Sequence, residues 1–344
     1  MTTDTICSGS NRLPLLDVVD LTVVFGNGGR HVVANHCVSV SVAAGETLGI
    51  VGESGSGKSV FCRALLRLLP TPPARISARH LTFQGQELLQ SSEREMRRIR
   101  GQGIAMIFQN PMSSLNPVWT IGDQIGEVLR LYKRIDRRAA QGGAIALLDK
   151  VGIASAARRV NEYPFQWSGG MLQRAMIAMA LAGEPKMILA DEPTTALDVT
   201  IQDQILSLLM DLQRETGMAL VLVSHDMGII AETCDRVAVM YAGRIVELGS
   251  TSEIFNGPAH PYTIGLLNSV IPLDRTVRRL ASIPGQPPDL TLLGVGCAFA
   301  ERCSLVVDNC SKGPIPFHQI TPGHLVACPM ALNRDQSSLP VDKR

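Results

Sequence analysis

The residues Gly52-Glu53-Ser54-Gly55-Ser56-Gly57-Lys58-Ser59 decide the fold of this chain. They match G-x-x-x-x-G-K-S, the pattern of a loop that wraps phosphate groups. The apolar run 47–51 before the loop predicts a strand, and the run 60–69 after it predicts a helix. Glycines let the backbone N–H groups point inward, and the positive end of the helix faces the same anion. The alternative is an ordinary glycine-rich turn, but the lysine and serine favour a nucleoside triphosphate site.

The bulk composition excludes several classes of protein. The 344 residues suffice for one large domain and a smaller one, and 45% of them are apolar. A net charge of +1 and an aromatic content of 4% argue against nucleic acid as a partner. Residues 1–11 lack the apolar core of a signal peptide, and no apolar run approaches the roughly 18 residues of a membrane span.

Alternating strand and helix patterns predict an α/β core. Continuous apolar runs at 187–190 and 219–223 are typical of strands buried in a parallel sheet. Residues 121–151 are mostly helical by pattern. Prolines and four cysteines accumulate after residue 258, so we predict two domains, at 14–258 and 259–344.

Carboxylates follow the apolar run 187–190 directly. Asp191 is placed to anchor Mg²⁺, and Glu192 to orient or deprotonate an attacking water. The alternative is that both cap the next helix. Gln109 and His225 follow two other predicted strands, where each could touch a γ-phosphate or be an ordinary polar residue.

A second glycine-led helix start lies at Ser168-Gly169-Gly170. It could bind an anion as the first loop does, or it could be a plain helix cap. Two such sites in one chain suggest a nucleotide that is shared between two chains.

The ordered set of these motifs resembles the nucleotide-binding subunit of an ATP-binding-cassette (ABC) transporter, over residues 15–258. The set comprises 52–59, Gln109, 168–171, 187–192, 196–198 and His225. The resemblance implies the ABC type of P-loop NTPase fold, with an antiparallel β subdomain, a helical subdomain and a small C-terminal cysteine-rich domain.

The resemblance also implies a role for each matching residue. The residues implied for ATP are Phe25, Gly52, Glu53, Ser54, Gly55, Ser56, Gly57, Lys58 and Ser59, and those implied for Mg²⁺ are Ser59, Gln109 and Asp191. The implied catalytic residues are Glu192, His225 and Gln109. The signature residues implied to close on the ATP of an opposing subunit are Ser168, Gly169, Gly170 and Met171, with Asp198 at the dimer seam. Phe25 stands where tyrosine is more usual, so a core phenylalanine is the alternative for it.

The cysteines after residue 258 form a spaced group of four: Cys297, Cys303, Cys310 and Cys328. Four thiolates can hold Zn²⁺ or an iron–sulfur cluster, although the C-x2-C spacing usual for zinc is missing. The alternative is four unlinked cysteines, which we also expect for the scattered Cys7, Cys37, Cys62 and Cys234.

Three segments, 260–263, 283–288 and 296–303, resemble the C-terminal extension of oligopeptide and dipeptide importer ATPases. Some members of that family hold a [4Fe-4S] cluster on such cysteines. The proline usual before the Gly-Cys pair is absent, since Gly294-Val295 stand there.

This second resemblance implies an ATPase subunit that hydrolyses ATP to drive the uptake of peptides or similar small solutes. Its implied partners are a second ABC ATPase subunit, identical or paralogous, two transmembrane permease subunits, and a periplasmic or extracellular solute-binding protein. The implied location is peripheral, on the cytoplasmic face of the cell membrane. The alternative is a soluble ABC-type ATPase whose C-terminal module senses redox state or metal.

Overall fold

The computed structural model describes residues 14–27, 30–195, 197–269 and 283–331. The scattered Cys7 and position 196 of the predicted dimer seam therefore lie outside the described residues, as do parts of the predicted C-terminal domain.

A large mixed sheet forms the centre of the described molecule, in the order β12-β13-β11-β10-β3-β9-β8-β7. Its strands are β3 (Thr47–Val51), β7 (Ile104–Ile107), β8 (Met187–Asp191), β9 (Ala219–Ser224), β10 (Arg236–Tyr241), β11 (Arg244–Ser250), β12 (His318–Thr321) and β13 (His324–Val326). The five strands from β10 to β7 run parallel, whereas the pairs from β10 to β12 are antiparallel. The parallel core predicted from the apolar runs is confirmed.

Apolar side chains cover both faces of this sheet, which explains the continuous apolar runs. Along β8, Ile188 and Ala190 pack into the core on one face, while Met187 and Leu189 pack into the core on the other. Successive side chains of a strand point to opposite faces, so a strand buried on both sides has no polar position.

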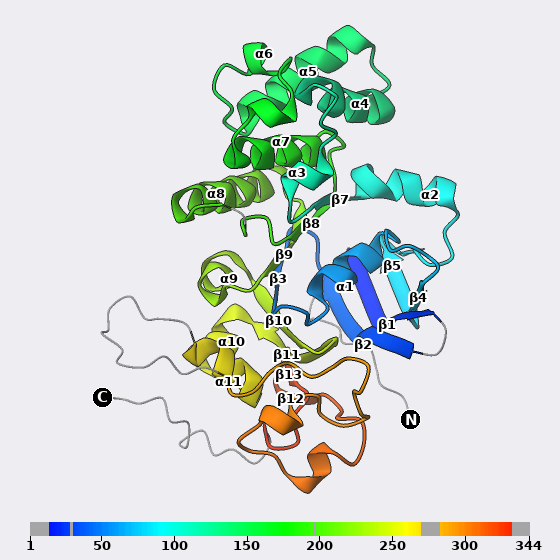
Figure 1. Cartoon of the computed structure of the whole chain (residues 1–344), viewed down its shortest axis with the longest axis vertical. Helices are drawn as coiled ribbons and strands as arrows, with labels where there is room; N and C mark the ends of the chain where they lie inside the picture. The colour runs from blue at the N-terminus through cyan, green and yellow to red at the C-terminus, as the bar shows by residue number, and fades with distance from the viewer. Residues whose placement is uncertain (1–13, 28–29, 196, 270–282, 332–344) are drawn as a thin grey trace.

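The second sheet is antiparallel and lies against α1 (Lys58–Leu65) (Figure 1). Its strands are β1 (Leu16–Asn27), β2 (Arg30–Val42), β4 (Ala74–Ser77), β5 (His80–Phe83) and β6 (Gln86–Glu87). They share one apolar core with α1 and the facing side of the large sheet. This sheet is the antiparallel β part that the fold prediction included.

Most of the helices cover the other face of the large sheet or build one end of the molecule, whereas α1 and α2 (Glu93–Arg98) pack on the same side as the antiparallel sheet (Figure 1). The longer ones are α1 (Lys58–Leu65), α4 (Ile121–Lys133), α5 (Arg137–Lys150), α7 (Gly169–Leu181), α8 (Val199–Thr216) and α11 (Pro261–Asn268). The shorter ones are α2 (Glu93–Arg98), α3 (Pro111–Ser114), α6 (Ala156–Arg159), α9 (Met227–Thr233) and α10 (Thr251–Asn256), with single turns η1 (Ile99–Gly103), η2 (Pro164–Gln166), η3 (Ala300–Arg302) and η4 (Asp308–Cys310).

Helix α1 ends earlier than the apolar run 60–69 predicts. The helix stops at Leu65, and Arg67 adopts a positive φ of 51°. The Arg67 guanidinium donates to the carbonyl oxygens of Leu88 and Ser91, at 3.3 and 2.5 Å. This side chain ties the end of α1 to the segment before α2, which sequence periodicity alone does not report.

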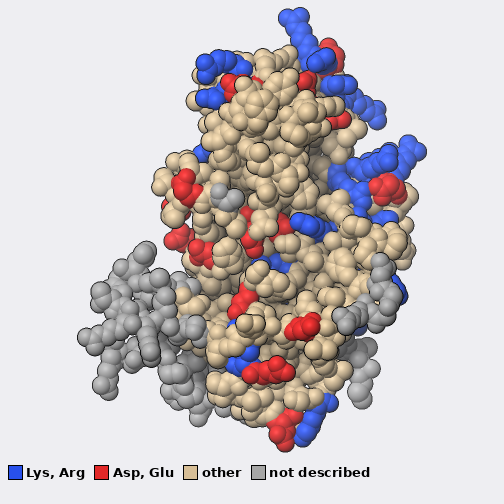
Figure 2. Space-filling model, viewed as in Figure 1, with Lys and Arg blue, Asp and Glu red and all other residues tan. Residues whose placement is uncertain are grey.

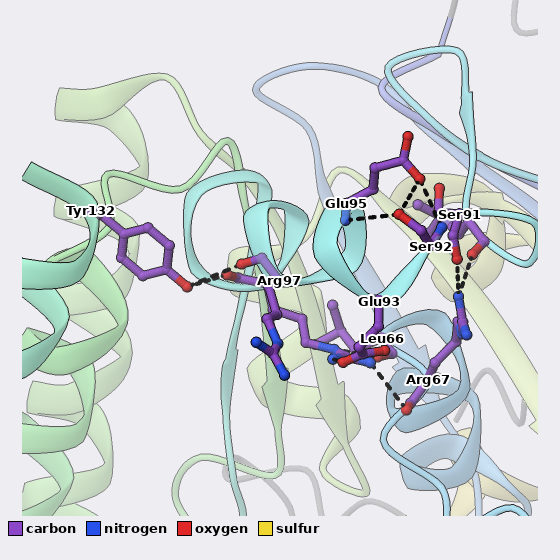
Figure 3. A network of polar contacts seen from close by, with 10 residues as sticks. Leu66, Arg67, Ser91, Ser92, Glu93, Glu95, Arg97 and Tyr132 are labelled. Carbon is purple, nitrogen blue, oxygen red and sulfur yellow. Dashed lines mark hydrogen bonds and ion pairs between the residues drawn. The ribbon is translucent and has the colours of Figure 1, made fainter.

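Polar contacts join α1, α2 and α4 into one unit (Figure 3). Arg100 donates to the carbonyl oxygens of Leu66 and Arg67, and it pairs with Glu93 at 2.5 Å. The Tyr132 hydroxyl reaches from α4 and donates to the carbonyl of Arg100. The helical end of the molecule is therefore braced against the helix that begins at the phosphate-loop lysine.

The C-terminal segment joins the large sheet. Strand β13 pairs with β11, where Glu247 lies opposite Val326 and Leu248 opposite Leu325.

Figure 2 shows Lys and Arg gathered over the α4–α6 end and over α2, while both signs of charge are scattered elsewhere on this face.

Candidate functional site

The ends of four parallel strands bring the predicted residues together. Strands β3, β9, β8 and β7 are neighbours in that order, so their carboxyl ends share one edge of the sheet. The phosphate loop follows β3, His225 follows β9, Asp191 ends β8, and Gln109 comes shortly after β7. This edge is where an open α/β sheet binds its ligand.

Two glycines of the loop are required by close backbone contacts. A Cβ on Gly52 would collide with the carbonyl oxygen of Met240, and a Cβ on Gly57 would collide with that of Ala34. Gly57 also has a φ of 98°, which disfavours any larger residue. The buried Asn35 amide donates to the Gly57 carbonyl at 3.1 Å, so β2 supports the loop from behind.

Lys58 lies inside the loop. Its Nζ donates to the carbonyl oxygens of Gly52 and Glu53, at 2.7 and 2.9 Å, and to the Ser56 hydroxyl at 3.3 Å. Burial lowers the pKa of the ammonium group, while the charges of Glu192, Asp191 and Glu53 oppose that shift. A desolvated cation that the loop's own oxygens hold in place is suited to bind phosphate.

Asp191 and Ser59 form the predicted magnesium pair. The Ser59 hydroxyl donates to Asp191 Oδ1 at 2.7 Å, and burial raises the pKa of Asp191. The other carboxylate oxygen, Oδ2, is buried with no hydrogen-bond partner among the described residues. Hydroxyl and carboxylate oxygens are the ligands that Mg²⁺ prefers, so this pair fits that ion.

Three side chains converge on Glu192, which follows β8. Gln109 Nε2 and the Thr195 hydroxyl each donate to Glu192 Oε2 at 2.9 Å, and His225 Nδ1 lies 3.7 Å from the same oxygen. Glu192 has a φ of 48°, a left-handed conformation that is costly for a residue with a side chain. The structure thus brings the three predicted catalytic residues into one cluster and adds Thr195, which the sequence reasoning missed.

The signature residues begin α7. Ser168 caps the helix, and its hydroxyl accepts from the Met171 N–H at 3.4 Å. Ser168 and Gly169 are exposed, and a Cβ on Gly170 would lie 2.8 Å from a methyl group of Ile201 in α8. Within the described residues, no hydrogen bond or ion pair joins this helix start to the phosphate loop of the same chain.

Two other predicted residues serve local packing as well. Asp198 caps α8, where it accepts from the Ile201 N–H at 3.0 Å. Phe25 is half-buried in β1, opposite Val32, and packs against the core between the two sheets.

The cysteine group does not form the predicted metal site. Burial raises the pKa of Cys297 to about 11 and also raises that of Cys328, and the nearby thiols of Cys303 and Cys310 add to both shifts. Among the described residues, however, no three Cys, His, Asp or Glu side chains converge closely enough to hold a metal ion. The residues therefore do not fit a [4Fe-4S] cluster or zinc in this geometry, and the expectation of iron–sulfur is unsupported.

Two residues of the C-terminal segment contact the phosphate loop, and sequence reasoning assigned a role to neither. Tyr262 accepts from the Glu53 N–H at 2.8 Å, and Arg302 pairs with the Glu53 carboxylate at 2.6 Å. Both residues lie in segments that resemble the importer extension, and this resemblance is the sequence feature that could have indicated a role for them.

Comparisons with known proteins agree with this geometry. Residues 36–195 match the family described as ABC transporter, and residues 246–310 match the oligopeptide/dipeptide transporter C-terminal region. A putative peptide import ATP-binding protein of Brucella melitensis is 48% identical over 329 residues, covering 92% of this chain and 97% of the relative. The oligopeptide transport ATP-binding protein OppD of Escherichia coli is 48% identical over 314 residues, covering 91% and 92%.

A solved structure also resembles the chain. It is a dimeric ATP-binding cassette in a post-hydrolysis state bound to ADP and Pi, with a TM-score of 0.62 and 27% identity, over 69% of this chain and 98% of that one. In the described ranges, no helix is long and apolar enough to cross a membrane. The alternative of a soluble ATPase with a sensing module gains no support from these comparisons.

Proposed function

This chain belongs to the ABC transporter family and carries its oligopeptide/dipeptide C-terminal region, and from that premise we propose that it is the ATP-hydrolysing subunit of a peptide importer. One observation carries the chemistry: Lys58, Ser59, Asp191, Glu192 and Gln109 meet at one sheet edge. The hydrolysed substrate is ATP, and the imported solutes are peptides or similar small molecules.

The residues divide the work of phosphoryl transfer. The N–H groups of the loop and Lys58 hold the β- and γ-phosphates of ATP. Glu192 orients a water for in-line attack on the γ-phosphate and takes up its proton, while Gln109 and His225 hold the reacting groups in register. Phe25 supports the adenine.

Magnesium would be held by Ser59, Asp191 and Gln109, all of which offer oxygen atoms. The ion supplies neutralisation of the charge that builds on the phosphate oxygens. The unpartnered Oδ2 of Asp191 supports this assignment.

A second chain completes the site. Ser168, Gly169, Gly170 and Met171 lie at the start of a helix that, among the described residues, makes no hydrogen bond or ion pair with its own phosphate loop. We therefore propose that they serve ATP held by an opposing subunit. Asp198 would lie at the seam between the two subunits. The opposing subunit is a second copy or a paralogue.

The remaining partners follow from importer architecture. Two transmembrane permease subunits would dock near Gln109 and residues 110–165, and a solute-binding protein would deliver the substrate. The chain would then be peripheral, on the cytoplasmic face of the membrane. Residues 14–258 would form the nucleotide-binding domain and 259–344 the importer extension. We propose no iron–sulfur cluster for the importer extension, because no three potential metal ligands converge among the described residues.

The substitution Glu192→Gln tests the function. It should abolish ATP turnover in the assembled transporter while ATP still binds, because the amide cannot take up the proton of the attacking water. Turnover is measured as phosphate release, and binding by calorimetry. The matched control is Glu232→Gln, an exposed change on α9 that should leave turnover unchanged. Full turnover in the Glu192 variant would refute the assignment.

The substrate class has its own test. Phosphate release by the transporter, reconstituted with its membrane partners and binding protein, should rise when short peptides are added. Stimulation by another solute class and none by peptides would keep the ATPase assignment and overturn the peptide assignment.

A further inference from the structure

Glu53 is the only acidic residue of the phosphate loop. Its backbone N–H, its carbonyl oxygen and its carboxylate all form hydrogen bonds. Its N–H donates to the Tyr262 hydroxyl at 2.8 Å, and its carbonyl accepts from Lys58 Nζ at 2.9 Å. Its carboxylate accepts two hydrogen bonds from Arg302, at 2.6 and 3.0 Å. Two of these three contacts come from the C-terminal segment, far along the chain.

The Arg302 side chain is buried and fixed by several contacts besides its pair with Glu53. Its side chain is 6% exposed, against 26% for that of Glu53. It also donates to the Tyr241 hydroxyl at 3.2 Å and to the Pro284 carbonyl at 2.8 Å. The guanidinium lies 5.8 Å from the ring centres of Tyr241 and Phe299. A buried bidentate pair of this kind has a defined geometry, unlike most exposed ion pairs.

The position of Glu53 raises an electrostatic problem. A loop that binds the polyanionic phosphates of ATP carries a carboxylate next to its binding lysine, and the charge of Glu53 acts on Lys58. Like charges that are partly shielded from water repel one another by several kcal/mol when they are not compensated. A positive partner for Glu53 therefore matters for the affinity of the loop.

We propose that Arg302 is a positioning residue for ATP, which neutralises and orients Glu53 so that the phosphate loop can accept the nucleotide. The importer extension thereby completes the ATP site of its own chain, in addition to any contact it makes with other subunits. This inference rests on the proposed ATP function, which it deepens.

A purely mechanical brace is the competing explanation, and it makes different predictions. If Arg302 acted only as a brace, its loss would weaken all nucleotides alike, and neutralising Glu53 as well would restore nothing. If Arg302 acts by charge, its loss should harm ATP more than ADP, and removal of the Glu53 charge should compensate.

The experiment measures the affinity of the full-length chain for Mg-ATP and Mg-ADP by calorimetry. Arg302→Ala should weaken ATP binding about tenfold and ADP binding about threefold, because ATP carries the extra charge. The double variant Glu53→Gln/Arg302→Ala should return ATP affinity to within about threefold of the parent chain. Arg302→Lys keeps a charge without the two-pronged contact and should fall in between.

The matched control is Arg79→Ala, which removes an exposed ion pair with Asp20 in the antiparallel sheet and should leave both affinities unchanged. Thermal unfolding of each variant shows whether it is folded, and Arg302→Lys remains informative where Arg302→Ala does not fold. Equal ATP affinity in both Arg302 variants and the parent chain would overturn the proposal, as would a double variant that binds no better than Arg302→Ala. Failure of the parent chain itself to bind ATP would instead overturn the proposed function.

Discussion

Helices α1 and α7 each have a glycine at their start, Gly57 just before α1 and Gly169 as the first residue of α7, yet the surroundings of the two starts differ. The start of α1 is enclosed: Lys58 is 4% exposed, and it bonds to its own loop. The start of α7 is open, with Ser168 and Gly169 exposed.

The glycines at the two helix starts also face different kinds of neighbouring atom. At α1, Gly57 faces the backbone carbonyl of Ala34, which cannot turn away. At α7, Gly170 faces a side-chain methyl of Ile201, which can. The contrast supports the proposal that one chain provides an enclosed phosphate site and a second, open helix start that would serve a partner.

The largest effect should come from the enclosed start. Lys58→Ala should weaken ATP binding by roughly a hundredfold, because it removes a charged donor to the phosphates. Calorimetry with the isolated full-length chain measures this affinity. Lys150→Ala, which breaks an exposed pair with Glu215, is the control. Unchanged ATP affinity in the Lys58 variant would show that the start of α1 does not bind the phosphates, and would contradict the distinction between the two helix starts.

The open start should affect turnover without affecting binding. Gly169→Asp places a negative charge where the helix end would meet the partner's ATP, so turnover should fall by more than about tenfold. The affinity of the chain for its own ATP should not change. Gly142→Asp on α5, where a Cβ meets nothing within 4 Å, is the control. A parallel loss of binding in the Gly169 variant would place both starts at one site.

The smallest effects should be on stability. Gly57→Ala should cost about 2 kcal/mol, because of its φ of 98° and the fixed carbonyl of Ala34. Gly170→Ala should change stability by less than about 1 kcal/mol, since alanine favours the helix and Ile201 can shift. Urea unfolding measures both, and a reversed order would contradict the distinction between backbone and side-chain neighbours.

Much of the fold and site was predictable because local patterns report it directly. The apolar runs that became β8 and β9 are buried on both faces, and the loop motif depends on backbone conformations that only glycine allows. The ends of parallel strands place Gln109, Asp191 and His225 together for topological reasons.

The parts that were missed depend on contacts distant in the chain. Thr195 and Arg302 are ordinary residues until folding brings them to Glu192 and Glu53. The cysteine spacing identified four neighbouring thiols but could not say whether they converge, because residue type without a backbone constraint leaves side-chain direction open.

The pairing of β13 with β11 has a consequence for the order in which the molecule can be completed during synthesis. Until residues 325 and 326 have been made, β11 presents a row of unpaired N–H and C=O groups along the edge of the sheet. A nascent chain that already contains its ATP-site residues therefore still exposes the unpaired backbone groups of β11, to which another strand could pair. Strand β13, the last described strand, therefore covers β11 late in synthesis, and β12, which pairs with β13, becomes the outer strand of the described sheet.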